Sequence, residues 1–306
     1  MRILLLGCFG QVGWELQRAL APLGNVTAIP RQGDGNFCGD LTQVEALAAT
    51  IRQLAPDVIV NAAAHTAVDR AESELGESAA INATAPEVLA AEAKAVGAWL
   101  VHYSTDYVFD GSGTRPWQED DSPRPLNVYG LTKLDGERAI QQSGCRHLIF
   151  RTSWIYAARG TNFIRTILRL SAERENLRVI NDQHGAPTGA ELIADTTALA
   201  LQQSFAQDNT SGLYHLAASG ETTWFGYARH VISAARDAGW PVRTADNGVQ
   251  PVSSDKFETV AERPKNSRLD TSKVESKFGI RMPEWRIGVD RTLNEILACE
   301  LKGRRA

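Results

Sequence analysis

The sequence predicts an α/β protein built on a doubly wound parallel sheet, and two observations support this prediction. Short apolar, β-branched runs alternate with longer Ala-, Leu- and Glu-rich stretches over the first half of the chain. The short runs are apolar at nearly every position, as in strands that helices cover on both faces. Strands are expected at 2–6, 25–29, 57–61, 99–104 and 147–153. Helices are expected between them at 13–21, 43–54, 69–75 and 83–96.

The alternation loosens beyond residue 154. A helical pattern at 162–175 is followed by a loop-like stretch at 181–191, another helix at 192–204 and polar turns over 245–272. We therefore expect a first domain over 1–153 and a smaller C-terminal unit over 154–306. The two should be partly interleaved, with some later segments returning to the first domain.

Composition limits the partners that the chain can have. With 306 residues and 43% hydrophobic content, the chain can bury a large core. A formal net charge of -4 provides no basic field for nucleic acid or an anionic membrane. The apolar start ends at Gly7, and no later stretch is long enough to cross a bilayer. The four cysteines are scattered without a C-x-x-C pair, which fits a reducing compartment, so we expect a cytoplasmic protein.

A glycine-rich turn joins the first expected strand to the first expected helix. Gly7, Gly10 and Gly13 follow the pattern G-x-x-G-x-x-G. Glycines at this place permit a tight turn and close approach of a pyrophosphate, which the helix N-terminus then binds. The turn predicts a Rossmann-type dinucleotide site in which the backbone of Gln11 and Val12 meets the phosphates. A purely structural turn is the alternative.

Residues after the second strand bear on the choice of cofactor. No acid follows 25–29 to bind a ribose hydroxyl; Arg31 stands there instead and could pair with a 2′-phosphate. This favours NADPH, leaves NADH open, and has a solvated surface arginine as its alternative. Asp40 and Leu41, after an expected strand end, could contact the adenine. Asp40 could equally be the N-cap of the helix over 42–54.

Three small residues follow the strand at 57–61. Ala62, Ala63 and Ala64 would let a flat ligand lie against the backbone. Close packing of a strand end against a helix would explain the same alanines. We predict that they line the cofactor site.

A tyrosine and a lysine lie four residues apart in an expected helix. This spacing places Tyr129 and Lys133 on one helix face. A phenol has a pKa near 10, and an adjacent ammonium favours its ionised form. A hydroxyl from Ser104 or Thr105, at the end of the strand over 99–104, could bind a substrate carbonyl. The pattern predicts proton transfer by a tyrosine that a lysine tunes.

The glycine turn, the Ser/Thr strand end and the tyrosine–lysine pair, in this order and spacing, resemble the extended short-chain dehydrogenase/reductase family. The resemblance implies that Tyr129 exchanges the proton, that Lys133 also holds the nicotinamide ribose, and that Thr105 orients the substrate oxygen. It further implies NADPH or NADH as cofactor.

The run "STDYVFDG" over 104–111 separates this chain from the family's dehydratases. Those members carry an acidic pair, whereas here Asp106 is followed by Tyr107, so carbonyl reduction is the better prediction. Strings over 10–20, 56–72, 102–111, 125–137, 150–156, 180–195 and 263–270 resemble members that reduce the C4 carbonyl of a dTDP-linked keto sugar. That resemblance implies a nucleotide-sugar substrate.

The same resemblance extends to the substrate contacts. It implies that Asp106 and Trp154 contact the sugar nucleotide, although Trp154 could equally be a core residue. Segments 185–192 and 263–270 would form walls around thymidine and diphosphate. Arg263 and Arg268 are candidate phosphate partners, with surface ion pairs as the alternative.

Metal and oligomer predictions also come from the resemblance. It implies a homodimer bridged by Mg²⁺, with Glu15 and Glu191 near the metal, while Glu15 could simply complement a helix dipole. Two other functions stay open. One is reduction or epimerisation of a different nucleotide-linked keto sugar, and the other is a cofactor-binding regulatory subunit similar to that of methionine adenosyltransferase.

Overall fold

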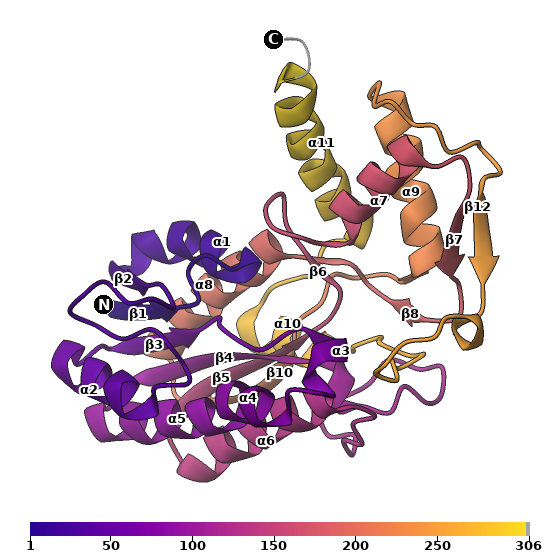
Figure 1. The fold of residues 1–306 in the computed structure, drawn as a ribbon. Helices are drawn as coiled ribbons and strands as arrows, with labels where there is room; N and C mark the ends of the chain where they lie inside the picture. Colours follow the sequence, from indigo (N-terminus) through magenta and orange to yellow (C-terminus); the bar gives the residue numbers. More distant parts are fainter. Residues whose placement is uncertain (304–306) are drawn as a thin grey trace.

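The computed structural model describes residues 1–303 and places a six-stranded, all-parallel sheet at the centre of the fold (Figure 1). The strand order is β10–β5–β4–β3–β1–β2. Their bounds are Arg2–Leu6 (β1), Asn25–Ile29 (β2), Val58–Asn61 (β3), Trp99–Thr105 (β4), Arg146–Thr152 (β5) and Gly212–His215 (β10). The predicted fold class, a Rossmann-type doubly wound parallel sheet, is confirmed.

Helices cover both faces of the sheet (Figure 1). On one face lie α2 (Val44–Leu54), α5 (Ala85–Val96) and α6 (Val128–Ser143), packed on residues such as Leu4, Leu100 and Ile149. On the other lie α1 (Gln11–Leu20) and α8 (Ala190–Ala206), packed on Leu5 and Val101. Because successive side chains of a strand point to opposite faces, strands covered on both sides bury both sets of side chains, and β3 and β4 are buried at every position.

A second group of elements forms a separate core beside the sheet. It contains α7 (Phe163–Glu173), α9 (Trp224–Asp237) and α11 (Trp285–Gly303), with β7 (Leu177–Ile180) paired to β12 (Val249–Val252). Ile167, Tyr227 and Trp285 lie in its centre. In Figure 1 this group stands above and to the right of the sheet.

Three later elements lie with the first group. β10 extends the sheet beyond β5, α8 packs against α1, and α10 (Ser272–Phe278) contacts β10. The boundary at residue 153 stays a prediction, and residues 304–306 of the second unit lie outside the described residues.

Several predicted elements differ in detail. The helix expected at 69–75 is two short helices, α3 (Val68–Ala71) and α4 (Leu75–Ala79), followed by η2 (Ala80–Thr84), a π-helical turn. The segment predicted as loop over 181–191 contains β8 (His184–Gly185) and β9 (Thr188–Gly189), and the turns over 245–272 contain β12 and η4 (Ser254–Lys256). Strands of two to four residues are too short to show a hydrophobic period. Their partners are distant in sequence: β11 (Thr222–Thr223) pairs with β8, and β6 (Ile155–Tyr156) with β9.

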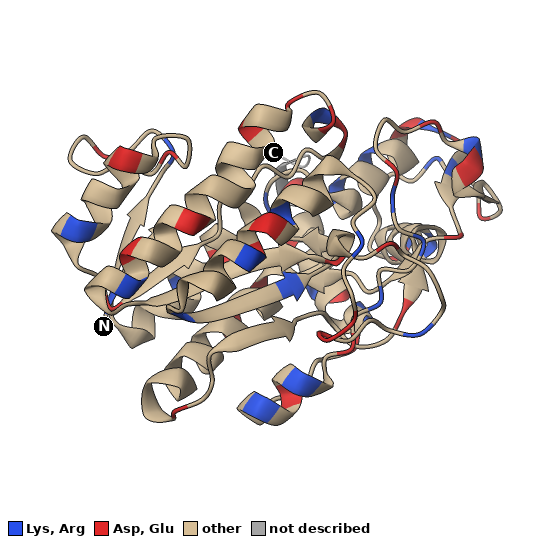
Figure 2. Ribbon diagram, turned by 90° about the horizontal axis from the view of Figure 1, so that it is seen from below, with Lys and Arg blue, Asp and Glu red and all other residues tan. Residues whose placement is uncertain are grey.

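Charges of both signs are interspersed along the helices and loops (Figure 2). All four cysteines are free thiols. Among the residues that the structure describes, no helix combines the length and apolarity needed to span a bilayer.

Candidate active site

A cleft of about 590 Å³ opens at the carboxyl ends of the central strands. This is the point where the chain order reverses, because β1 pairs with β2 on one side and β3 on the other. Open α/β sheets bind ligands at such a switch point. The lining residues come from several strands and helices and from the loops between them, and they are Gly7, Gly10, Gln11, Val12, Asn61, Ala62, Ala63, Ala64, Thr66, Val68, Tyr103, Ser104, Thr105, Asp106, Tyr107, Tyr129, Lys133, Thr152, Ser153, Trp154, Ile155 and Trp224.

The glycine turn is shaped for a ligand backbone. Gly7 has φ +77°, and a Cβ atom there would lie 2.6 Å from the Ala63 nitrogen. A Cβ on Gly13 would lie 2.1 Å from the Gly7 carbonyl oxygen, so only glycine lets α1 pack this closely on the turn. Gly10 is the N-cap of α1, whose first N–H groups point toward the cleft end of β1. The turn therefore fits a dinucleotide pyrophosphate.

Of the other residues predicted to bind the cofactor, some line the cleft and one lies in the core. Ala62, Ala63 and Ala64 line the cleft as expected. Leu41 is buried in the core under α2, so its side chain packs on protein. Gln11 lines the cleft, and its Oε1 accepts a hydrogen bond from Asn162 at 3.0 Å.

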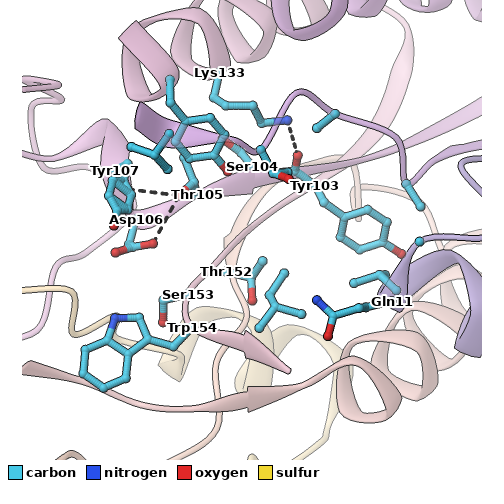
Figure 3. Close-up of a pocket in the computed structure, with 18 of the residues that line it drawn as sticks. Gln11, Tyr103, Ser104, Thr105, Asp106, Tyr107, Lys133, Thr152, Ser153 and Trp154 are labelled. Carbon is cyan, nitrogen blue, oxygen red and sulfur yellow. Dashed lines mark hydrogen bonds between the residues drawn. The ribbon is translucent and has the colours of Figure 1, made fainter. Parts of the chain in front are cut away.

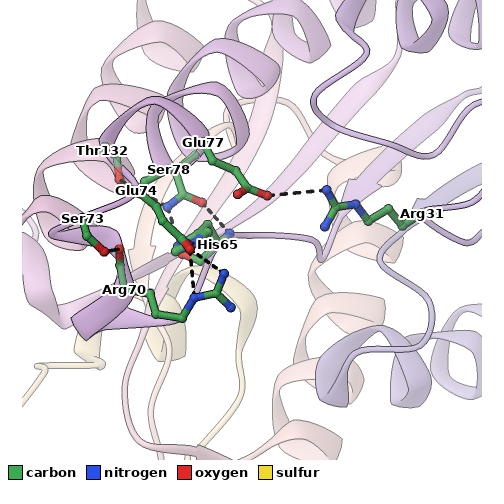
Figure 4. Close-up of polar contacts among 9 residues, drawn as sticks. Arg31, His65, Arg70, Ser73, Glu74, Glu77, Ser78 and Thr132 are labelled. Carbon is green, nitrogen blue, oxygen red and sulfur yellow. Dashed lines mark hydrogen bonds and ion pairs between the residues drawn. The ribbon is translucent and has the colours of Figure 1, made fainter.

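Arg31 and Asp40 form a charged pair after β2. The Arg31 guanidinium lies 3.5 Å from the Asp40 carboxylate. It also lies 3.6 Å from Glu77 of α4 (Figure 4). Asp40 does not follow a strand; it lies in a turn before α2, where its Oδ1 accepts from the Thr42 backbone and hydroxyl. The N-cap of α2 is Gln43, so Asp40 is not that cap. These long, exposed contacts leave the guanidinium able to exchange partners.

Tyr129, Lys133 and Thr105 all line the cleft, and Figure 3 shows Lys133 and Thr105 on the same side of it. The turn before α6 ends at Asn127, whose Oδ1 accepts from the Gly130 N–H at 2.8 Å and caps the helix. A Cβ on Gly130 would lie 2.2 Å from the Tyr107 carbonyl, so α6 sits directly on the turn after β4. This contact places Tyr129 near Thr105, whose hydroxyl lowers the pKa of the phenol. The sequence thus folds locally to bring α6 and the end of β4 together.

The electrostatics of the pair differ from the expectation. Burial raises the pKa of Tyr129 to about 12, against a smaller lowering by Thr105, whereas a lowering by Lys133 was predicted. Lys133 does not offset this burial because its own pKa is lowered by burial to about 8. Its Nζ donates to the Tyr103 carbonyl at 2.6 Å. Tyr129 therefore keeps its proton in the free site, which suits a proton donor.

Asp106 lies beside these hydroxyls and is almost wholly buried. Its Oδ1 accepts from Thr105 at 3.1 Å, and Ser267 also bonds to the carboxyl group. Burial raises its pKa to about 6. Its Oδ2 has no partner within the described residues, so the atom is free to receive a substrate hydroxyl.

Trp154 faces the catalytic residues across the cleft (Figure 3). Its φ of +48° is strained for a bulky residue, and its ring stacks on Trp224 at 3.7 Å between centroids. A Cβ on Gly185 would lie 2.8 Å from the Trp154 ring, so the chain closes tightly behind it. Strain at a cleft residue indicates a functional position.

The sequence analysis missed several cleft residues. Trp224 lies seventy positions beyond its stacking partner, and only the tertiary fold joins them. Thr152 and Ser153, at the end of β5, could have been found by the strand-end argument that identified Thr105. Asn61, the last residue of β3, could have been found in the same way.

A second cavity of about 660 Å³ adjoins the first and shares Tyr107 and Trp224 with it. Arg263 lines this cavity, while its guanidinium donates to Asp69 at 2.7 Å. Arg268 bonds to Glu221 and lines none of the described cavities. Arg263 is thus the better placed of the two predicted phosphate partners.

Glu15 and Glu191 lie on the packed helices α1 and α8. Glu15 is one of the charges that raise the pKa of Glu191, after burial as the main cause. Each carboxylate forms an ion pair: Glu15 lies 3.5 Å from Arg18, and Glu191 lies 3.5 Å from Arg291. Within residues 1–303, no three acidic, histidine or cysteine side chains are grouped to bind a metal. One chain alone therefore does not supply a magnesium site here.

The fold and cleft together define a nicotinamide-dependent reductase of the extended short-chain dehydrogenase/reductase class. A sequence profile described as the RmlD substrate binding domain matches residues 1–298. The chain is 55% identical to a dTDP-4-dehydrorhamnose reductase of Escherichia coli K12 over 97% of its length and 98% of that protein. It is 44% identical to one from Burkholderia thailandensis, over 97% and 100%. The chain belongs to the dTDP-4-dehydrorhamnose reductase family.

Solved structures agree with this assignment. A dTDP-4-dehydrorhamnose reductase of Clostridium acetobutylicum superposes with a TM-score of 0.86 at 32% identity, over 97% of this chain and 99% of that one. One from Bacillus anthracis, in complex with NADP, gives 0.85 at 31% identity, over 96% and 99%. A UDP-glucose 4-epimerase of Thermus thermophilus shares the fold at 0.78 and 18% identity.

Proposed function

We propose that this protein reduces the C4 carbonyl of dTDP-4-dehydro-β-L-rhamnose with NADPH or NADH to give dTDP-L-rhamnose. The observation that carries the proposal is that Thr105, Tyr129 and Lys133 line the same cleft as the glycine turn. A reductase needs a hydride and a proton delivered to opposite ends of one carbonyl. The cleft offers a dinucleotide site and a phenol within the same space.

The chain's residues account for the proton side of the reaction. The bound nicotinamide supplies the hydride to C4. Thr105 donates a hydrogen bond to the carbonyl oxygen, and Tyr129 gives its phenolic proton to the alkoxide that forms there. The raised pKa of Tyr129 keeps the phenol loaded in the free site. Lys133, whose pKa is about 8, exchanges protons near neutral pH and can reload the phenolate.

The remaining site residues have assigned roles in this proposal. Gly7, Gly10, Gln11, Val12 and Gly13 bind the pyrophosphate. Ala62, Ala63 and Ala64 flank the dinucleotide, Asp40 and the Leu41 backbone lie by the adenine, and Arg31 approaches a 2′-phosphate. Asp106 and Trp154 hold the sugar. The first unit, 1–153, then binds mainly the cofactor, and 154–306 mainly the nucleotide sugar.

We further expect a cytoplasmic homodimer. Magnesium would require Glu15 and Glu191 of two copies, since each glutamate already faces an arginine within one chain. Sedimentation with and without EDTA would distinguish a metal-bridged dimer from a metal-independent one.

The test of the proposal is turnover of the named substrate. Purified protein mixed with freshly generated dTDP-4-dehydro-L-rhamnose should oxidise NADPH or NADH and give dTDP-L-rhamnose, identified by NMR of the product sugar. Lys133→Met, which should turn over far more slowly, is the control. Cofactor binding without oxidation would contradict the proposal and favour another keto sugar or a regulatory role. Co-purification with a methionine adenosyltransferase catalytic chain would support the regulatory role.

A further inference from the structure

A histidine lies directly behind the cleft lysine. His102 of β4 points to the face that α6 covers and is 1% exposed. Its Nε2 lies 3.1 Å from Nζ of Lys133, and its Nδ1 lies 3.2 Å from Nδ2 of Asn61. The three side chains come from β3, β4 and α6, so the contact fixes two strands and the catalytic helix to one another.

The hydrogen-bond partners assign the proton on this histidine. The Asn61 amide oxygen accepts the Ala63 N–H at 3.2 Å, so the amide nitrogen must face His102. Nδ1 of His102 therefore accepts, and a neutral imidazole carries its proton on Nε2. That N–H points at Nζ of Lys133. An ammonium has no lone pair to accept it, whereas a neutral amine has one.

The charges around the pair agree with this arrangement. Burial lowers the pKa of His102 well below its usual range, and the positive charge of a protonated Lys133 lowers it further, so the imidazole is neutral with either form of the lysine. The charged group that acts on Lys133 is Glu137, one turn along α6. Arg151 of β5 binds that carboxylate at 2.9 Å and 2.6 Å, which reduces the support it gives to an ammonium. Tyr129, also on α6, is a neutral phenol.

We propose that His102 is a positioning residue for the reduction: its Nε2–H holds Nζ of Lys133 beside the Tyr103 carbonyl and stabilises the amine relative to the ammonium, so that both forms are accessible near neutral pH. The role rests on the proposed function, because His102 acts through Lys133. An amine poised in this way takes up and releases a proton during each turnover. A fixed ammonium would not.

The first test observes the tautomer and does not depend on turnover. Two-bond ¹H–¹⁵N correlation spectra of histidine-labelled protein should show His102, assigned by its loss in His102→Gln, as the Nε2–H tautomer. His215 is the internal control, since it is buried in the same sheet and its Nδ1 faces the Trp117 carbonyl at 3.0 Å. It should show the Nδ1–H tautomer. An Nδ1–H tautomer at His102 would overturn the proposal.

The same spectra report the lysine. The His102 shifts should change with an inflection near pH 8, where Lys133 titrates, and Lys133→Met should remove that inflection. A flat titration in the wild type would overturn the proposal, as would an inflection that survives Lys133→Met. Neither outcome depends on which sugar is the substrate, so failure here is distinct from failure of the proposed function.

The second test separates positioning from general stability. His102→Leu should lower kcat about tenfold in the wild-type background, and less than twofold once Lys133 is already methionine. His215→Gln, the matched control, should have the same small effect in both backgrounds. Equal losses from His102→Leu in both backgrounds would overturn the proposal. If the leucine variant does not fold, His102→Gln takes its place in the same cycle.

Discussion

The two ends of the active-site cleft are built differently. The end that holds Tyr129, Lys133 and Thr105 consists of side chains on β4 and α6; Thr105 and Lys133 are buried, and Lys133 donates a short hydrogen bond to the Tyr103 carbonyl. The opposite end is formed by Trp154 and Trp224, which lie at the boundary of short or irregular segments and meet through a ring stack. Regular elements fix the first end, and tertiary contacts between distant segments fix the second.

The difference indicates a division of labour. Proton transfer needs atoms held within a fraction of an ångström, which helices and strands provide. Sugar recognition needs a surface that can differ between enzymes of one fold, which loops and aromatic side chains provide. The comparison therefore predicts that changes at the first end reduce kcat and that changes at the second end raise KM.

Among the variants that compare the two ends of the cleft, the largest effect is expected at Lys133. Lys133→Met removes the amine that reloads Tyr129, so kcat should fall about 100-fold or more, with a smaller change in the KM of the sugar nucleotide. Steady-state kinetics measure both. Lys94→Met is the control, because Lys94 bonds to the Ser143 carbonyl on the exposed side of α5 and should turn over normally. An equal fall in kcat in the two variants would contradict the prediction that changes at this end of the cleft specifically reduce kcat.

The next effect is on stability and arises at Asp106. Its pKa of about 6 exceeds the usual 3.8, so the folded state binds the proton more tightly. This contribution to the free energy of unfolding is fully present below about pH 4 and is lost as the pH rises from about 4 to 6. Asp106→Asn should therefore raise the free energy of unfolding at pH 7 by roughly 2 to 3 kcal/mol, and leave it unchanged near pH 3.5.

Urea denaturation at the two pH values checks this prediction. Asp110→Asn is the control with the opposite sign, because hydrogen bonds from Ser112 lower the pKa of Asp110. That variant should lose stability at pH 7. If Asp106→Asn is less stable than the wild type at pH 7, the Asp106 carboxylate stabilises the fold, and the prediction that its burial lowers the free energy of unfolding is wrong.

A smaller effect is expected at Trp154. Trp154→Ala removes the stack on Trp224, so the KM of the sugar nucleotide should rise about tenfold while the Kd of NADPH stays unchanged. Trp154→Phe keeps part of the ring surface, so its KM for the sugar nucleotide should lie between those of the wild type and Trp154→Ala. Fluorescence titration of NADPH and initial rates separate these quantities. A fall in kcat with unchanged KM would reverse the roles of the two ends.

The smallest effect is expected at Arg31, at the far end of the cofactor. Its ion pairs with Asp40 and Glu77 are long and exposed, so Arg31→Ala should raise the KM of NADPH about fivefold, and that of NADH hardly at all. Arg52→Ala, which breaks a pair with Glu92 away from the cleft, is the control. Equal effects on both cofactors would show that Arg31 does not contact the 2′-phosphate.

The sequence predicts the first end of the cleft well and the second end poorly. Strand 25–29 has its observed bounds, and Thr105 and Tyr129 lie where their offsets from a strand end and a helix start place them. Such positions depend on local periodicity. The Trp154–Trp224 stack and the return of β10 to the sheet depend on contacts between distant residues, which periodicity does not report.

The charge states of the site residues could not be predicted from the sequence either. Spacing alone suggested that Lys133 lowers the pKa of Tyr129, yet both groups are buried, and burial disfavours both charged forms. His102, adjacent to the lysine through the sheet, carries no signal in the sequence because its partner is thirty-one residues away. Burial is a property of the fold, so pKa values could not be predicted from spacing.

The most direct test of the central claim is the Tyr129→Phe variant with dTDP-4-dehydro-L-rhamnose. The ring and its packing are kept, and only the proton that the alkoxide receives is removed. Loss of NADPH absorbance should be slowed about 1000-fold, with the Kd of NADPH within about twofold of the wild type. Turnover near the wild-type rate would contradict the account, because the proton would then come from elsewhere.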